Sequence, residues 1–487
     1  MHYPQITHHG AVATVTGSCH ELHMDEHHSL LVDCGTLLES VDGEELSAVN
    51  SIQFALDTVK VLVLTHVHAD HVGRIPELLA AGYNGPILCS EPSAHLLPIV
   101  LQDAFSHQFG RSPEELDKYL TIINKRIIAL PFDRWFTIIE TDQLVCRVRL
   151  QRAGHILGSA YVECDINYPR EMRNKRVVFS GNLGSSHTPF LPSPKSPERA
   201  DMLVLESTYG DRLHEDRASR QQRLEAVIDQ ALADNGTVLI PAFSIGRTQE
   251  LLYEIEDILR RKAFADAPFP ADLEGAETDP ATGWSQLPVI LDSPLAASFT
   301  GIYRDFNDYW DAEAQERLSD GRRPLAFEQM ITIDSHDKHL QVVNYLSSTK
   351  RPAIVIAGHG MCAGGRIVNY LKAMLGDSRH NVIFVGYQVK GTPGAAIQKY
   401  GPQGGYVELD RERFKINAGV TTVGGYSAHA DQGELIEFVT GMSEWPGEVL
   451  LVHGESDAKK ELGQALMRKY ARMQKKINLQ IPNGEFN

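Results

Sequence analysis

Several features that mark particular protein classes are missing from this sequence. It contains no apolar run of the roughly 18 residues that a membrane span requires. Its six cysteines form no CxxC pair, which argues against a disulfide framework or a cysteine-type zinc site. The opening stretch MHYPQITHHGAV lacks a basic segment followed by an apolar core, so we expect no secretion signal. These absences favour a reducing, cytoplasmic compartment.

The sequence also has fewer basic than acidic residues, 46 Lys and Arg against 63 Asp and Glu, which gives a formal net charge of -17 at pH 7. A protein of this charge repels polyanions at long range, so nucleic-acid binding would need a local basic groove or metal ions. The overall charge therefore argues mildly against a nucleic-acid partner.

The length of 487 residues exceeds one ordinary hydrophobic core, so we expect two domains. Up to residue 207, short strands such as SLLVDCG and KRVVFSG are interrupted by helical stretches, as in a layered α/β domain. From 208 to 420, helices alternate with apolar strands such as TVLIPAF and AIVIAG. This alternation predicts a parallel sheet flanked by helices, with ligand loops at the strand C-termini.

Residues 421–487 return to loops that carry histidines, followed by a basic helix. We therefore predict that residues 208–420 are an insertion that divides the first domain into residues 1–207 and 421–487. Residues 265–284, rich in Ala, Pro, Asp and Glu, are predicted to form a mobile surface loop without a catalytic role.

The most specific motif is VLVLTHVHADHVGRIPELL, in which a buried strand is followed by His66, His68, Asp70 and His71. A helix is expected to begin just beyond. Alternate residues leaving a strand point the same way, so His66 and His68 can bind one ion while Asp70 and His71 turn to a second.

This stretch resembles the metal-binding motif of the metallo-β-lactamase superfamily, and three further motifs of that family follow in order. Asp33 in LLVDCG matches the acid that orients the ligand loop, and His155 in AGHILGSA matches a further ligand. FSGNLG matches the motif whose carboxylate usually bridges two ions, but the residue here is Asn182.

The second half of the chain narrows the resemblance. Glu206 in VLESTYGDR, His429 in GGYSAHAD and His453 in LLVHGES resemble motifs A, B and C of the β-CASP nucleases. PAFSIGRTQELL and GMCAGGRIVNYL are also similar to that branch, so the resemblance covers nearly the whole chain. It implies a four-layer αββα metallo-β-lactamase domain with an inserted β-CASP domain, and we expect no additional N-terminal RNA-binding domain.

The resemblance implies a site for two Zn²⁺ ions. The implied ligands are His66, His68 and His155 for one ion, Asp70, His71 and His453 for the other, with Asn182 at the bridging position. His429 would donate a proton to the leaving 3′-oxygen, and Glu206 would hold its imidazole. Because an amide is neutral and offers one good oxygen donor, we expect Asn182 to weaken the binding of at least one ion.

Substrate phosphates need hydrogen-bond donors, and glycine-rich loops at strand ends provide backbone amides. AGHGMCAGG, residues 357–365, is placed for this role, with Arg366 opening the next helix. The predicted substrate-binding residues are Ser427, Gly358, His359, Gly360, Arg247, Arg366 and Lys390.

Seven of the 21 histidines fall within the first 28 residues. A hairpin turn and an exposed strand edge explain them more simply than a metal site does.

These features predict a zinc-dependent ribonuclease that acts on single-stranded RNA. The alternative is an RNA-binding pseudonuclease with the same fold and little or no turnover. An inserted domain with motifs A to C disfavours a small-molecule hydrolase. The sequence leaves open endonuclease against 5′-exonuclease action, RNA against DNA, and a homodimer. It also leaves open whether Asn182 is natural or engineered.

Overall fold

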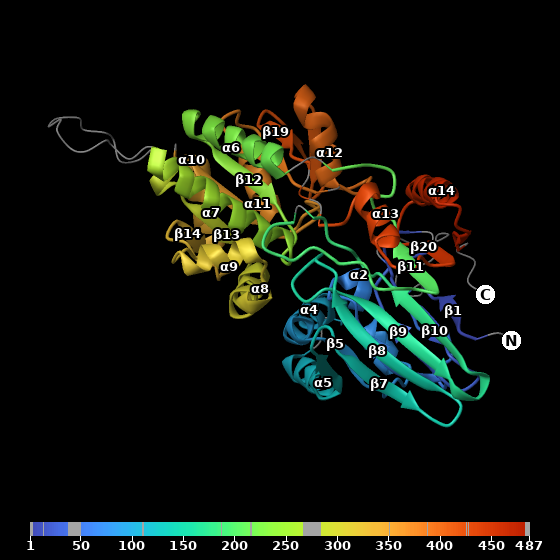
Figure 1. Cartoon of the computed structure of the whole chain (residues 1–487). Coiled ribbons are helices and arrows are strands. Elements are labelled where there is room, and N and C mark those ends of the chain that lie inside the picture. Colours follow the sequence, from blue (N-terminus) through green and yellow to red (C-terminus); the bar gives the residue numbers. More distant parts are fainter. Residues whose placement is uncertain are drawn as a thin grey trace. The chain divides into compact units, whose positions relative to one another are not determined.

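The computed structural model describes residues 3–12, 14–37, 50–109, 112–186, 188–214, 217–265, 284–349, 351–386, 388–424, 426 and 428–482. The chain divides into two compact units (Figure 1). The first comprises Met1–Ser186, Leu191–Leu213 and Ala428–Asn487, and the second comprises His187–Phe190 and His214–Ser427. Within the described ranges, no helix combines the length and the apolarity needed to cross a membrane.

Two sheets form the centre of the first unit. One has the order β1-β2-β3-β4-β5-β6, with antiparallel pairs up to β3 and parallel pairs beyond it. The other has the order β21-β20-β11-β10-β9-β8-β7, parallel from β21 to β10 and antiparallel from there to β7. Their strands are β1 Gln5–His8, β2 His20–His23, β3 Ser29–Val32, β4 Val59–Val63, β5 Ile87–Ser90, β6 Ile127–Leu130, β7 Trp135–Glu140, β8 Val145–Arg152, β9 Ala160–Tyr168, β10 Arg173–Phe179, β11 Met202–Glu206, β20 Glu448–Val452 and β21 Asn478–Gln480.

The two sheets pack face to face around one hydrophobic core. In β8, Cys146, Val148 and Leu150 alternate with more exposed residues, as expected for a strand with one buried face. They belong to the same buried cluster as Val63 of the other sheet. Sheet-on-sheet packing of this kind removes both inner faces from water and fixes the strand ends that carry the site.

Helices cover the outer faces of these sheets. The helices of the first unit are α2 Ala69–Val72, α3 Ile75–Ala80, α4 Glu91–Phe109, α5 Pro113–Arg126, α13 Gln432–Thr440 and α14 Ser456–Arg472. Leu435 of α13 and Leu462 of α14 pack with Leu203 and Leu451 of the second sheet, and α4 contacts β5 and β6 of the first (Figure 1). The layers therefore follow the order helix, sheet, sheet, helix, which confirms the predicted α/β class.

The second unit contains a six-stranded sheet with the order β14-β13-β15-β12-β16-β19, and every pair in it is parallel. Its strands are β12 Thr237–Pro241, β13 Val289–Asp292, β14 Met330–Thr332, β15 Ala353–Ala357, β16 Asn381–Phe384 and β19 Gly419–Thr422. A separate hairpin pairs β17 Tyr406–Leu409 with β18 Glu412–Lys415. The helices are α6 Arg217–Ala233, α7 Arg247–Ala265, α8 Pro294–Asp305, α9 Ala312–Ser319, α10 His336–Ser348, α11 Arg366–Met374 and α12 Pro393–Tyr400.

The predicted parallel, helix-flanked sheet is thus confirmed. Val355 and Val382 pack with Val343 of α10 and Leu371 of α11 in one buried cluster. The predicted surface loop at residues 265–284 falls largely on residues 266–283, which lie outside the described residues.

Candidate metal centre

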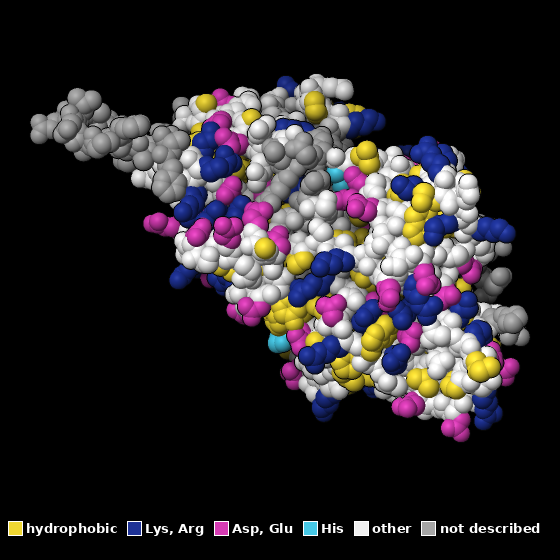
Figure 2. All heavy atoms as spheres, viewed as in Figure 1, with side chains coloured by type: hydrophobic (Ala, Val, Ile, Leu, Met, Phe, Trp, Pro, Cys, Tyr) yellow, Lys and Arg dark blue, Asp and Glu magenta, His cyan; other side chains and the backbone are white. Residues whose placement is uncertain are grey.

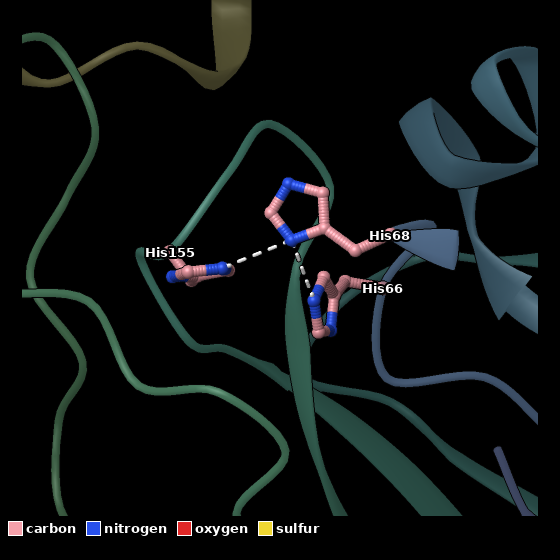
Figure 3. Close-up of side chains that lie close together, drawn as sticks. All are labelled: His66, His68 and His155. Carbon is pink, nitrogen blue, oxygen red and sulfur yellow. Dashed lines mark hydrogen bonds between the residues drawn. The ribbon is translucent and has the colours of Figure 1, made fainter. Parts of the chain in front are cut away.

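Three histidines converge where two loops of the first unit meet. His66 follows β4, His68 caps the start of α2, and His155 lies in the loop between β8 and β9. Figure 3 shows the Nδ1 atom of His68 facing both of the other rings, at 3.1 Å from His66 Nε2 and 3.2 Å from His155 Nε2. The candidate ligand atoms of these three residues all lie within 4.8 Å of one another.

A second trio consists of Asp70, His71 and His453, whose candidate ligand atoms also lie within 4.8 Å of one another. Nε2 of His453 is 3.3 Å from Nε2 of His71 and 3.3 Å from Oδ2 of Asp70. Asp70 and His71 lie within the short helix α2, and α3 begins at Ile75, which confirms the helix expected just beyond the motif. His453 follows β20 and has a φ of 49°, a strained conformation that persists where the surroundings enforce it.

Asp33 orients the second trio through a hydrogen bond to His71. Its Oδ2 accepts hydrogen bonds from His71 Nδ1 at 2.7 Å and from Thr65 Oγ1 at 2.8 Å, while Oδ1 accepts one from the Thr65 amide at 2.8 Å. Because Nδ1 of His71 donates, its Nε2 keeps a lone pair that faces the trio.

The first trio is oriented in the same manner. Nδ1 of His66 lies 3.1 Å from the Thr65 hydroxyl, whose own hydrogen goes to Asp33. Nδ1 of His155 donates to the carbonyl oxygen of Ala428 at 3.1 Å. Both histidines therefore present Nε2 as the free electron-pair donor, which is the form that a metal ion requires.

Glu206 links His429, Thr208 and His453 through hydrogen bonds. Its Oε2 accepts hydrogen bonds from His429 Nδ1 at 2.9 Å and from Thr208 Oγ1 at 2.6 Å, and Oε1 accepts one from the Leu183 amide at 2.6 Å. The Thr208 hydroxyl lies 3.1 Å from Nδ1 of His453. Glu206 thus holds His429 directly and His453 through Thr208.

Burial and charge set the protonation of this cluster. Burial lowers the pKa values of His66 and His155 well below the ordinary value, and neighbouring histidines lower them further. Burial raises the pKa of Asp70, but His71 and His453 outweigh it, so that pKa is lowered. Burial also raises the pKa of Glu206, and the charge and hydrogen bond of His429 reverse that effect. Burial lowers the pKa of His71, but Asp70 and Asp33 outweigh it, so that pKa is raised. The site therefore holds neutral imidazoles at His66 and His155 beside the ionised carboxylates of Asp70 and Glu206.

Asn182 lies in the loop after β10, beside the first trio. Its side chain is 2% exposed, and its Nδ2 is 3.4 Å from Nε2 of His66. Its Oδ1 is buried and has no hydrogen-bond partner among the described residues. The preceding Gly181 has a φ of 52°, and a Cβ there would lie 2.6 Å from Cβ of Thr65, so the tight loop requires glycine.

These residues fit bound metal ions. Nitrogen and carboxylate oxygen are the donors that zinc prefers. Hydrogen bonds at Nδ1 leave Nε2 available on His66, His71 and His155, whereas His68 presents Nδ1. The unpartnered Oδ1 of Asn182 adds a buried acceptor that a cation would satisfy. The chain therefore has a histidine-rich metal-binding site.

Some residues of the site were not predicted from the sequence. Thr65 and Thr208 carry hydroxyls that link carboxylates to histidines, and each stands next to or within a predicted motif. His20 was predicted to lie on a hairpin or an exposed edge, but it is 4% exposed and lines the same small cavity as Asp33 and His71. That prediction was wrong because β2 turns His20 toward the sheet interface, whereas His27 in the following turn is exposed.

The predicted substrate-binding residues lie in the second unit, apart from Ser427, which is outside the described residues. Gly358, His359 and Gly360 follow β15, and Lys390 lies exposed between β16 and α12.

The two arginines among them are engaged by carboxylates. Arg366 Nη1 donates to Asp292 Oδ1, and Arg247 Nη1 donates to Glu250 Oε2, both at 2.6 Å. Their predicted role in phosphate binding stays a prediction.

Three family models match the chain. The model of the metallo-β-lactamase superfamily matches residues 16–241, and the model of the β-CASP domain matches residues 248–397. A model described as the RNA specificity domain of Zn-dependent metallo-hydrolases matches residues 413–482.

Relatives of the chain align over most of its length. Ribonuclease TTHA0252 of Thermus thermophilus is 32% identical over 463 residues, which cover 94% of this chain and 94% of that protein. Transcription termination factor FttA of Methanococcus maripaludis is 27% identical over 447 residues, covering 89% of this chain and 64% of that protein. FttA of Pyrococcus abyssi is 30% identical over 433 residues, which cover 87% of this chain and 61% of that protein. This chain therefore spans less than two thirds of the length of these two archaeal relatives.

Proposed function

This chain belongs to the β-CASP nucleases of the metallo-β-lactamase superfamily, and from that membership we propose that it is a zinc-dependent ribonuclease of RNA processing or decay. The observation that carries the proposal is the convergence of two ligand trios beside the Glu206–His429 pair. The relative TTHA0252, named a ribonuclease, and the match to an RNA specificity domain support RNA as the substrate.

In the proposed site, His66, His68 and His155 hold one zinc ion, and Asp70, His71 and His453 hold the other. Such ions, when bound, supply Lewis acidity and lower the pKa of bound water. Asp33 orients the ligands on both sides, directly through His71 and by way of Thr65 through His66.

His429 is the proposed proton donor. The hydrogen bond from Nδ1 to Glu206 fixes the orientation of the imidazole. When the oxygen of a water molecule bonds to the phosphorus and the bond from phosphorus to the 3′-oxygen breaks, Nε2 can deliver a proton to that leaving oxygen. The products are then a 3′-hydroxyl and a 5′-phosphate.

Asn182 favours a second candidate function, an RNA-binding pseudonuclease. A carboxylate at this position would neutralise part of the charge of two cations, whereas the amide offers one neutral oxygen. Six of the seven predicted ligands are histidine or aspartate and converge, so we favour an active enzyme with weakened metal binding.

The two candidates are separated by metal analysis combined with cleavage of an end-labelled single-stranded RNA. We expect the unaltered chain to cleave the RNA slowly and Asn182→Asp to hold zinc more tightly and cleave faster. Binding without cleavage by both proteins would identify the pseudonuclease. An Asn182→Asp variant that gains neither metal nor activity would refute the bridging role of this position, and a better duplex-DNA substrate would refute the ribonuclease assignment.

The remaining predictions belong to the same proposal. The compact unit His214–Ser427 and the family match at residues 248–397 support an inserted domain at residues 208–420.

All six cysteines lie within the described residues, buried and free, which supports a reducing cytoplasmic compartment. A homodimer stays a prediction, to be checked by measuring the mass of the protein in solution.

A further inference from the structure

The C-terminal edge of the parallel sheet in the second unit is a connected surface. Gln388 Nε2 donates to the carbonyl oxygen of Gly360 at 3.1 Å, and the Gly394 amide donates to that of Met361 at 3.0 Å. These bonds join the segment after β16 to the loop after β15. Open parallel sheets bind their ligands at this edge.

Two aromatic rings are exposed at equivalent positions on this edge. Phe243 and His359 each stand two residues beyond the ends of β12 and β15, which are paired at Pro241 and Ala357. Phe243 is 48% exposed, and His359 is exposed as well. The ring centroids are 6.0 Å apart, with 59° between the ring planes.

The loop backbone holds both rings in place. A Cβ at Gly360 would lie 3.1 Å from two carbons of the Phe243 ring, so the glycine allows the backbone to pack against it. The Met361 amide donates to His359 Nδ1 at 3.2 Å, which leaves the hydrogen of the neutral imidazole on Nε2. The second ring is therefore both a stacking surface and a hydrogen-bond donor.

Lys390 is exposed on this edge, but the two arginines of the same edge are engaged by carboxylates. Asp292 and Glu250 already engage Arg366 and Arg247, which reduces what these arginines can offer to a phosphate. Figure 2 shows one face of the molecule, on which basic and acidic side chains are interspersed. A base is therefore a better partner for this edge than a phosphate, because stacking on an aromatic ring needs no excess of positive charge.

We propose that Phe243 and His359 form a subsite that stacks a nucleobase of single-stranded RNA, an inference that rests on the proposed ribonuclease function. A base in an unpaired strand presents its π face, whereas a duplex keeps its bases stacked on each other. The subsite would tolerate different bases, since every base has such a face.

The test measures the affinity of the whole zinc-loaded chain for an end-labelled oligouridylate, in a His429→Ala background that slows turnover. We expect Phe243→Ala to weaken binding about 5- to 150-fold, the range for loss of one stacked base. Phe243→Trp should preserve binding, and the salt dependence should stay unchanged because no phosphate contact is lost. The matched control is Tyr345→Ala, which removes an aromatic ring on α10 that is 49% exposed and should leave affinity within about twofold.

A scan with RNAs that each carry one abasic residue locates the stacked base. At one position the abasic RNA should lose as much affinity as Phe243→Ala, and the variant should lose nothing further there. Equal affinities of Phe243→Ala and the parent chain, or a changed salt dependence, would overturn the subsite. Cleavage of RNA by the unaltered chain is measured separately: cleavage with no effect of Phe243→Ala refutes the subsite alone, whereas neither cleavage nor binding refutes the ribonuclease as well.

Discussion

His429 lies beside the two ligand trios and belongs to neither of them. Nδ1 of His429 donates to the buried carboxylate of Glu206, and the ring centroid lies 4.4 Å from that of His155 and 6.0 Å from that of His453. We therefore propose that His429, which is held by Glu206 and belongs to neither trio, transfers a proton and does not bind a metal ion.

We therefore expect His429→Ala to keep its zinc and to lose about 10²- to 10⁴-fold in turnover, the usual contribution of a general acid. Zinc content is measured by elemental analysis and turnover with end-labelled RNA. His27→Ala, which removes an exposed histidine from the hairpin turn between β2 and β3, is the control and should match the parent. Unchanged cleavage by His429→Ala would remove this residue from the mechanism.

The Thr208 hydroxyl is expected to support the proposed ligand His453, and a substitution at Thr208 tests this role. Thr208→Val keeps the shape of the side chain but breaks the link from His453 Nδ1 to Glu206, so His453 loses its preferred tautomer. We expect zinc to bind about 10- to 100-fold more weakly to the second trio, as for the loss of other outer-shell partners. Titration against a competing chelator measures the affinity, and Thr208→Ser should retain it. A valine variant with parental affinity for both ions would contradict this role.

At the scale of elements, the end of β13 is joined to two helices by one buried carboxylate. Asp292 accepts hydrogen bonds from His339 of α10 at 2.7 Å, Arg366 of α11 at 2.6 Å and Tyr370 of α11 at 2.5 Å. Burial raises the pKa of Asp292, but these three partners outweigh it and lower the pKa below the ordinary 3.8. The network positions the start of α11 and the glycine-rich loop that precedes it.

Because the folded-state pKa is depressed, the stabilisation by ionised Asp292 is present above pH 3.8 and is lost as the pH falls through the lower folded-state value. Asp292→Asn should cost about 3–5 kcal/mol at neutral pH, since it leaves buried partners of the carboxylate uncompensated, and should reduce the loss of stability on acidification. Thermal unfolding across about pH 2 to 7 measures both effects. Asp334→Asn breaks an exposed pair with Lys338 and should leave Tm unchanged. An Asp292→Asn variant as stable as the parent would show that the network does not hold these elements.

The sequence predicted more about the individual helices and strands than about the contacts between them. The run TVLIP reads as a fully buried strand and is β12, all of whose residues are buried. Arg366 was expected to open a helix and is the first residue of α11. The pairing of Arg366 with Asp292 was not predictable, because the two residues are 74 positions apart and meet only through the sheet.

At the scale of the whole molecule, metal binding is linked to folding. Any ion that binds the folded site and not the unfolded chain stabilises the protein by mass action, about 2.7 kcal/mol at 100 times its Kd. We therefore expect added zinc to raise Tm, a chelator to reverse the change, and Asn182→Asp to show the larger effect at equal zinc. Calorimetric scans of both proteins with and without chelator measure the difference, and a Tm insensitive to chelation in both would argue against metal ions in this site.

The sequence by itself determined which donors the site contains. The motif HVHADH places four of these donors within six consecutive residues. Their local spacing is the same in any fold that places the motif after a strand. The tertiary structure decided how they are held. Strands β11 and β20 pair in parallel with Glu206 opposite Val452, and this register brings Thr208 to His453 across 245 positions of sequence. Hydrogen bonds between such distant residues depend on strand order and register, so Thr208 and the buried His20 could be assigned to the site only once the sheets had assembled.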